Sequence, residues 1–143
     1  MTVGICSGYF QRFHNGHIDY IKSALNYFDY VVVIINNDIQ QRNKYKDFEI
    51  IRSSEDIAAE IRNKFKVERF RIITSIDVDG TVCETLKLIR SLYPKSRLYF
   101  CKDGDRNKKN TPEIKVLRKN RIKYINFLNP KIDSSTEIMK KGE

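Results

Sequence analysis

Short apolar runs alternate with amphipathic stretches along the chain, and this alternation limits the possible folds more than any other feature of the sequence. Five runs have the length and the β-branched or aromatic content of buried strands. A strand followed repeatedly by a helix favours a parallel sheet covered on both faces. We therefore expect an α/β fold, a Rossmann-like doubly wound sheet of five parallel strands, with its strands at residues 3–6, 30–35, 70–74, 98–101 and 122–128.

The stretches between these runs carry apolar residues at helical spacing. Helices are expected near residues 16–28, after Ser53, over 82–92, after Thr111 as an N-cap and after Ser134. The polar residues 39–52 and 102–110 are expected to form surface loops. No linker or internal repeat divides the 143 residues, so we expect one domain over 1–143.

Charge and composition restrict the class of protein. The net charge of +9 comes from 27 basic and 18 acidic residues, which suits nucleic acid or the phosphates of a nucleotide. No segment approaches the ~20 apolar residues needed to cross a membrane, and no signal-peptide pattern precedes the first strand. Three scattered cysteines are typical of small core residues in a reducing compartment. We expect a cytoplasmic protein that does not bind membranes.

His14 and His17, the two histidines of the chain, flank Asn15 and Gly16 between the first strand and the first helix. A helix N-terminus offers unpaired N–H groups and a partial positive charge, and Gly16 lets a ligand approach the backbone. Imidazole donors there can follow negative charge that develops on a phosphoryl group. The pattern predicts a phosphate site; ordinary surface histidines or half of a zinc site are the alternatives.

Two further segments are expected beside this turn. Strands one and four lie next to each other where such sheets reverse their order, so the loop after strand four overhangs the same crevice. Its Gly104, Asp105 and Arg106 offer a carboxylate and a guanidinium to a nucleotide. The hydroxyls of Ser134, Ser135 and Thr136 open the last helix, where they suit phosphate or simply cap the helix.

These motifs together resemble the cytidylyltransferase-like family of HxGH nucleotidyltransferases. The shared pattern is Gly8-Tyr9-Phe10, then His14-Asn15-Gly16-His17, a lysine after strand two, Gly104-Asp105 and the closing Ser/Thr segment. The chain is most similar to a subgroup without assigned substrates, related to glycerol-3-phosphate cytidylyltransferases. The resemblance implies catalytic roles for His14, His17, Lys44 and Lys46, and nucleotide binding by Gly8, Tyr9, Phe10, Gln11, Gly16, Gly104, Asp105, Arg106, Ser134, Ser135 and Thr136.

The chain departs from the family pattern at several positions. Gln11 stands where glycerol-3-phosphate cytidylyltransferases usually have Asp. Archaeal nicotinamide-mononucleotide adenylyltransferases have Gln there, followed by a proline that Arg12 replaces. The family arginine after the lysine loop falls on Ile57, so Arg52 or Arg62 is expected to substitute for it.

The resemblance implies transfer of CMP from CTP, or AMP from ATP, to a small phosphorylated metabolite such as a polyol or sugar phosphate. Pyrophosphate is released, Mg²⁺ accompanies the nucleotide, and a homodimer is expected. A nicotinamide-mononucleotide adenylyltransferase is the first alternative. A basic nucleic-acid-binding module is the second, although most aromatic residues fall at core positions, so no specific nucleic acid is expected. A nucleotide sensor without activity is the third, and the intact histidine pair counts against it.

Overall fold

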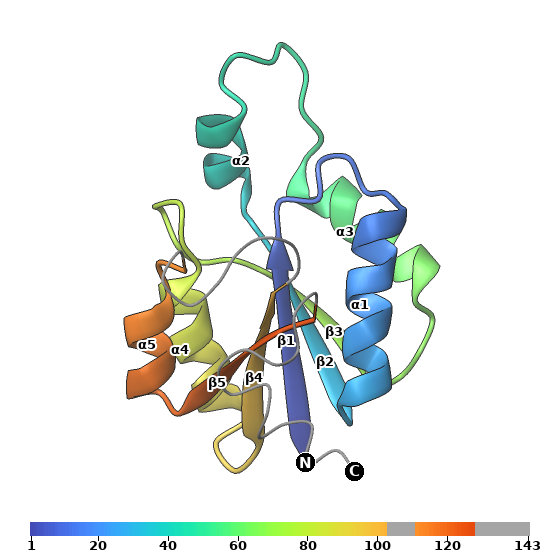
Figure 1. Ribbon diagram of the computed structural model, residues 1–143. Coiled ribbons are helices and arrows are strands. Elements are labelled where there is room, and N and C mark those ends of the chain that lie inside the picture. Colours follow the sequence, from blue (N-terminus) through green and yellow to red (C-terminus); the bar gives the residue numbers. More distant parts are fainter. Residues whose placement is uncertain (103–110, 128–143) are drawn as a thin grey trace.

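The computed structural model describes residues 1–102 and 111–127, and these residues build a five-stranded parallel sheet (Figure 1). The strand order is β3-β2-β1-β4-β5, so β1 lies in the centre and pairs with β2 on one side and β4 on the other. This order confirms the expected doubly wound fold. The strands are β1 (Thr2–Gly8), β2 (Tyr30–Ile35), β3 (Phe70–Thr74), β4 (Arg97–Lys102) and β5 (Ile122–Asn126).

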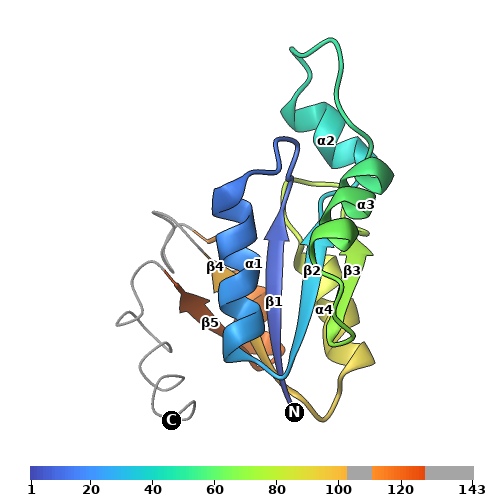
Figure 2. The same cartoon turned by 90° about the vertical axis from the view of Figure 1, so that its right-hand side faces the viewer.

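Helices connect the strands and cover the sheet (Figure 2). The longest of the described helices has 13 residues. Within residues 1–102 and 111–127, no helix has the length and apolar character that crossing a membrane requires. The helices are α1 (Asn15–Tyr27), α2 (Asp38–Lys44), α3 (Ser54–Lys64), α4 (Cys83–Leu92) and α5 (Ile114–Lys119).

The two faces of the sheet carry separate cores because successive strand residues point to opposite sides. Val31 and Val33 of β2 pack in the core that α1 and α3 cover. Val32 and Ile34 pack in the other core, under α4 and α5. All four side chains are fully buried, and burial of one such side chain stabilises a fold by about 1.5–3 kcal/mol.

The segment after β2 differs from the expected surface loop, because α2 forms within it. Asn37 caps this helix by accepting from the N–H of Gln40 at 3.0 Å, and the Gln40 side chain accepts from the N–H of Asn37. Gln40 and Gln41 are buried, although their polarity suggested a surface position. Figure 1 shows α2 and the loop after it beyond the carboxyl end of β1.

Smaller differences concern a helix start and a cysteine. Helix α5 begins at Ile114 with Glu113 as its N-cap, so Thr111 lies three residues before the helix and is not its cap. Cys6 and Cys101 are buried, as expected, whereas Cys83 is half-buried. The expected helix after Ser134 lies outside the described residues.

Asp77 fixes the start of α4 from the preceding loop. Its buried carboxylate accepts from the N–H groups of Glu84 at 2.7 Å and Thr85 at 3.0 Å, and from the Thr85 hydroxyl at 2.6 Å. Val82, the N-cap residue, provides no side-chain bond. Asp77 therefore satisfies helix N–H groups that would otherwise have no partner in this first turn.

The substitution Asp77→Ala is expected to lower the free energy of unfolding by about 1–3 kcal/mol, because it leaves buried donors unsatisfied. Urea unfolding followed by circular dichroism measures this change. Asp79→Ala is the control: Asp79 is exposed, and its side chain accepts from the N–H and the hydroxyl of Thr81 in the same turn. An equal loss of stability in both variants would contradict the role assigned to Asp77.

Candidate active site

The side chains of His14 and His17 cap the N-terminus of α1 by accepting hydrogen bonds from backbone N–H groups of the turn between them. Nδ1 of His14 accepts from the N–H of Gly16 at 3.0 Å, and Nδ1 of His17 accepts from the N–H of His14 at 3.3 Å. This is a capping box in which two imidazoles replace the usual hydroxyl and carboxylate. The H-x-x-H spacing therefore fixes both rings at one end of one helix.

These bonds determine where each imidazole carries its proton. A neutral imidazole accepts with one nitrogen and donates with the other. Because both Nδ1 atoms accept, both protons lie on Nε2. In this arrangement the helix end carries an Nε2–H donor on each neutral imidazole.

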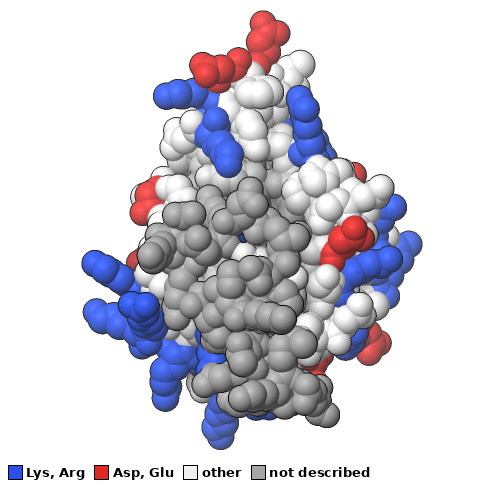
Figure 3. Space-filling model, viewed as in Figure 1, with Lys and Arg blue, Asp and Glu red and all other residues white. Residues whose placement is uncertain are grey.

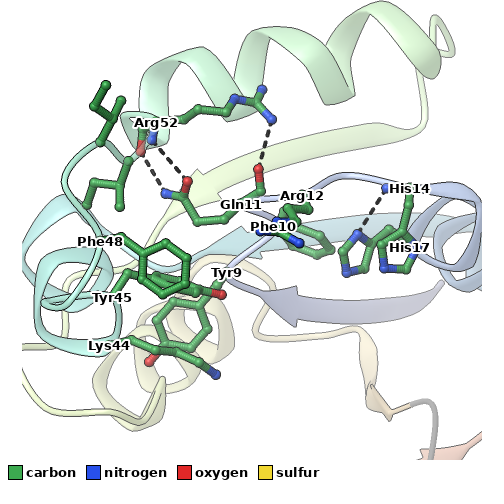
Figure 4. A pocket seen from close by; sticks show the side chains of 12 residues that line it. Tyr9, Phe10, Gln11, Arg12, His14, His17, Lys44, Tyr45, Phe48 and Arg52 are labelled. Carbon is green, nitrogen blue, oxygen red and sulfur yellow. Dashed lines mark hydrogen bonds between the residues drawn. The ribbon is translucent and has the colours of Figure 1, made fainter.

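Stacked rings hold His17, and burial lowers its pKa. The rings of His14 and His17 stack with centroids 3.9 Å apart (Figure 4). Phe13 stacks on the His17 ring with centroids 5.8 Å apart. Burial lowers the pKa of His17 below its ordinary value of 6.5, and the neighbouring His14 lowers it further. The backbone carbonyl of Arg12 opposes this shift without reversing it. His17 is therefore a neutral donor at pH 7.

Close packing restricts Gly16, and an unusual backbone conformation marks Phe10. A Cβ on Gly16 would lie 2.9 Å from Cε1 of His14, so any side chain at this position would push the His14 ring away from the cap. Phe10 has a left-handed backbone with φ of 54° and a buried ring 5.0 Å from the His17 ring. A left-handed aromatic residue is uncommon and costs strain, which the surrounding packing must hold.

Gln11 ties the β1–α1 loop to the segment before α3. Its Nε2 donates to Oε1 of Gln41 at 3.0 Å and to the carbonyl of Arg52 at 2.8 Å, and its Oε1 accepts from the N–H of Arg52 at 3.0 Å. The buried Gln41 in turn donates to the carbonyl of Tyr9 at 2.8 Å. These bonds position the loop. Gln11 also lines the pocket described next, and its expected contact with the nucleotide stays a prediction.

An open pocket of about 870 Å³ extends from the histidines to α2 and the loop after it. Lys44 lines this pocket, with its Nζ 4.3 Å from the centroid of the Tyr9 ring. Lys46 is exposed and is not among the lining residues. Of the two lysines expected at the site, the structure places Lys44 in the same pocket as the histidines and leaves Lys46 outside it.

Arg52 is one of the two arginines expected to substitute for the family arginine that is absent at Ile57. It lines the pocket and pairs with Glu60 at 2.6 Å, whereas the exposed Arg62 of α3 does not line it. The pocket also contains residues that sequence reasoning did not assign to the site. They are Arg12, Tyr45, Phe48, Ile50 and Ile51.

Lys102 places another cation at the crevice between β1 and β4. Its Nζ donates to the Ser7 hydroxyl at 3.1 Å and lies 4.8 Å from the centroid of the Phe100 ring. In the sequence, Lys102 stands only as the first residue of an expected polar loop. The usable signal was its position at the carboxyl end of the strand next to β1, where open α/β sheets bind ligands.

The other expected nucleotide ligands fall outside the described residues. They are Gly104, Asp105, Arg106, Ser134, Ser135 and Thr136. Gly8 and Tyr9 lie at and just after the end of β1, and Tyr9 lines the pocket. The described part of the site therefore consists of the histidine turn, the α2 side and Lys102 at the β4 side.

The described residues around the histidines offer donors and cations but no metal cage. Within residues 1–102 and 111–127, no group of three or more His, Cys, Asp or Glu side chains converges on one point. The lining of the pocket includes no carboxylate among those residues. These side chains suit an anion directly, and a divalent ion fits here only as part of a metal–nucleotide complex held by its phosphates.

Comparisons with known proteins agree with this geometry. The cytidylyltransferase-like family matches residues 5–141 of the chain. The phosphopantetheine adenylyltransferase of Mycoplasma mycoides subsp. mycoides is 29% identical over 127 residues, which cover 74% of this chain and 89% of that protein. The phosphopantetheine adenylyltransferase of Rubrobacter xylanophilus is 32% identical over 63 residues, 44% of this chain and 38% of that protein.

Solved structures share the fold at lower identity. A lipopolysaccharide core biosynthesis protein from Thermoplasma volcanium has a TM-score of 0.62 and 20% identity, covering 88% of this chain and 95% of its own. A bifunctional NMN adenylyltransferase/ADP ribose pyrophosphatase from Francisella tularensis, complexed with AMP and a manganese ion, has a TM-score of 0.65 and 18% identity. The match covers 98% of this chain and 41% of the chain of that protein. Because the family match spans nearly the whole sequence, this chain belongs to the cytidylyltransferase-like family and is a nucleotidyltransferase.

Proposed function

We propose that this enzyme transfers the nucleotidyl group of a nucleoside triphosphate to the phosphate of a small phosphorylated metabolite, with release of pyrophosphate. The observation that carries the proposal is the pair of imidazole N–H donors fixed at the N-terminus of α1. They line an open pocket that also holds Lys44. This arrangement favours a phosphoryl group that gains negative charge during reaction.

The reaction needs no general base. An oxygen of the acceptor phosphate, already anionic, attacks the α-phosphorus in line and forms the new P–O bond. The bond from the α-phosphorus to the β-phosphate oxygen breaks, and pyrophosphate leaves with the electron pair. Catalysis then consists of positioning and charge stabilisation, which fixed donors supply.

Three of the residues that line the pocket have roles in this scheme. His14 and His17 donate to oxygens of the α- and β-phosphates, and the neutral state of His17 lets it act as a donor without loss of a proton. Lys44 adds a positive charge on the acceptor side. Lys46 and the hydroxyls of Ser134, Ser135 and Thr136 stay predictions, as does nucleoside binding by Gly104, Asp105 and Arg106.

Mg²⁺ enters this scheme with the nucleotide. A structure with the same fold was solved with a manganese ion. A phosphate-bound Mg²⁺ keeps several waters and supplies charge neutralisation when bound. No step assigned above to the protein depends on a side chain that ligates the metal.

Three acceptors fit the proposed reaction. The family resemblance implies a polyol or sugar phosphate, Gln11 favours nicotinamide mononucleotide, and the two sequence relatives are named for phosphopantetheine. These relatives are named as adenylyltransferases, which favours ATP over CTP.

On the face drawn in Figure 3, basic side chains lie in several groups with acidic ones among them, which suits a nucleotide better than a nucleic-acid strand. A homodimer remains a prediction that light scattering measures.

We expect MgATP or MgCTP to raise the melting temperature, because a ligand that binds only the folded state stabilises it. A pyrophosphate-release screen of four nucleoside triphosphates against polyol phosphates, sugar phosphates, nicotinamide mononucleotide and phosphopantetheine then identifies the pair that reacts. The proposal fails if no nucleotide shifts the melting temperature and no pair releases pyrophosphate.

His17→Ala is expected to lower kcat by about 10²–10³ and to change KM for the nucleotide much less, because its donor acts on charge that grows in the transition state. Steady-state kinetics of pyrophosphate release measures both constants. Asp19→Ala, at an exposed position of the same helix, is the control and should keep normal kinetics. Normal turnover by a folded His17→Ala variant would place the reaction elsewhere.

The lowered pKa of His17 also makes stability depend on pH. The unfolded chain binds a proton at this position more tightly than the folded chain does. The contribution of His17 to the free energy of unfolding is therefore complete above pH 6.5 and declines as the pH falls from 6.5 toward the pKa in the folded state.

Two measurements check this dependence. The chain has two histidines, so an NMR titration resolves both, and the His17 signal should titrate below pH 6.5. In urea unfolding, His17→Asn should lose less stability than the natural chain between pH 7.5 and 5.5. A His17 pKa above 6.5 would contradict the neutral donor.

A further inference from the structure

The side of the pocket away from the histidines is an apolar wall. Tyr9, Tyr45 and Phe48 form a row of edge-to-face rings, with centroids 6.0 Å apart for the first pair and 5.5 Å for the second. Ile50 and Ile51 line the same pocket. Figure 4 shows this row on the opposite side of Gln11 from the two imidazoles. We call these five residues the apolar wall.

Two members of the wall are exposed although they are large and apolar. Phe48 is 55% exposed and Ile50 is 87% exposed. Both belong to the segment between α2 and α3, and neither is part of the two cores. A contiguous exposed apolar surface beside a reaction site is typical of a ligand-binding surface.

The wall has few groups that could bind hydroxyls. None of the described lining residues is a carboxylate, and both N–H groups of the one amide, Gln11, are already donated. Arg52 pairs with Glu60. The other neutral polar side chains that line the pocket belong to two tyrosines and two histidines, while Arg12 and Lys44 provide positive charge.

The position of the wall assigns it to the acceptor. The pocket is built from the β1–α1 loop, the end of α2 and the segment before α3, so it lies on the β2 side of the histidines. The crevice between β1 and β4, where the sheet reverses its order, lies on the other side and suits the nucleotide. An acceptor whose phosphate reaches the histidines from the β2 side places its organic group on the apolar wall.

We propose that the acceptor is a phosphate monoester whose organic group is apolar or aromatic, and that Phe48 and Ile50 select it. This inference rests on the proposed nucleotidyl transfer and narrows its substrate class. Lys44, which lies against the ring of Tyr9 in the same pocket, supplies positive charge that attracts the acceptor phosphate. A polyol phosphate loses hydration of its hydroxyls on the wall and finds few partners there, so it binds less well.

A matched set of acceptors tests the substrate class. Glycerol 3-phosphate and propyl phosphate have the same three-carbon chain with and without hydroxyls, and benzyl phosphate adds a ring. NMR titration of the enzyme gives the Kd of each, and pyrophosphate release with MgATP and with MgCTP gives kcat/KM. We expect benzyl phosphate to bind about tenfold or more tightly than glycerol 3-phosphate, with propyl phosphate between them.

Variants of the wall test the two named residues. Phe48→Ser and Ile50→Ser should each weaken benzyl phosphate about five- to tenfold and change glycerol 3-phosphate by less than about twofold. Ile76→Ser is the control, since Ile76 is 56% exposed and lies outside the pocket. All three positions are exposed, and circular dichroism checks that the variants fold.

The results separate this inference from the proposed function. Tighter binding of glycerol 3-phosphate, absence of benzyl phosphate binding, or an equal effect of Phe48→Ser on both acceptors would overturn the apolar acceptor while MgATP binding stays intact. Loss of affinity in Ile76→Ser equal to that in the wall variants would also overturn it. Absence of nucleotide binding and of pyrophosphate release would instead overturn the proposed function.

Discussion

The central position of β1 is the constraint on which the rest of this structure depends. It pairs in parallel with β2 through Val3 to Gly8 and with β4 through Thr2 to Cys6, so both of its edges are satisfied and both of its faces are buried. Because the chain leaves β1 at the point where the strand order reverses, its next residues must cross the carboxyl edge of the sheet. The histidine turn occupies this place as a consequence.

Hydrogen bonds from amide side chains hold α2 and the loops around the pocket against the sheet. Asn37 donates to carbonyls of Ser75 and Asp77, and Gln40 donates to those of Asp79 and Thr81, so α2 is fixed to the segment after β3. Gln41 donates to carbonyls of Tyr9 and Asn36. Amides suit this task because each offers two donors and an acceptor, and can therefore satisfy several loop carbonyls at once. The base of the pocket is therefore held by buried hydrogen bonds, whereas Phe48 and Ile50 on its apolar wall are exposed.

The sequence predicted the strands and the histidine turn well, because both depend on local patterns. The run at residues 30–35 is buried from both sides and reads as a strand without tertiary information. Helix α2 was missed because its polar composition resembles a loop, although Asn37 and Gln40 at capping-box spacing were a usable signal. The burial of Gln41 and the meeting of Tyr9 with Tyr45 depend on how distant segments pack, which periodicity does not encode.

Chemistry and selectivity occupy parts of the site with different physical character. The imidazoles are held by reciprocal caps, stacked rings and a strained Phe10, so substitution there disturbs geometry that several contacts determine together. Phe48 and Ile50 lie largely in solvent and contribute little to either core. Exposed positions tolerate exchange with small effects on stability. Under the proposed function, a chain built in this way can change the organic group it accepts through the segment between α2 and α3, while the turn proposed to act on the α-phosphate stays as it is.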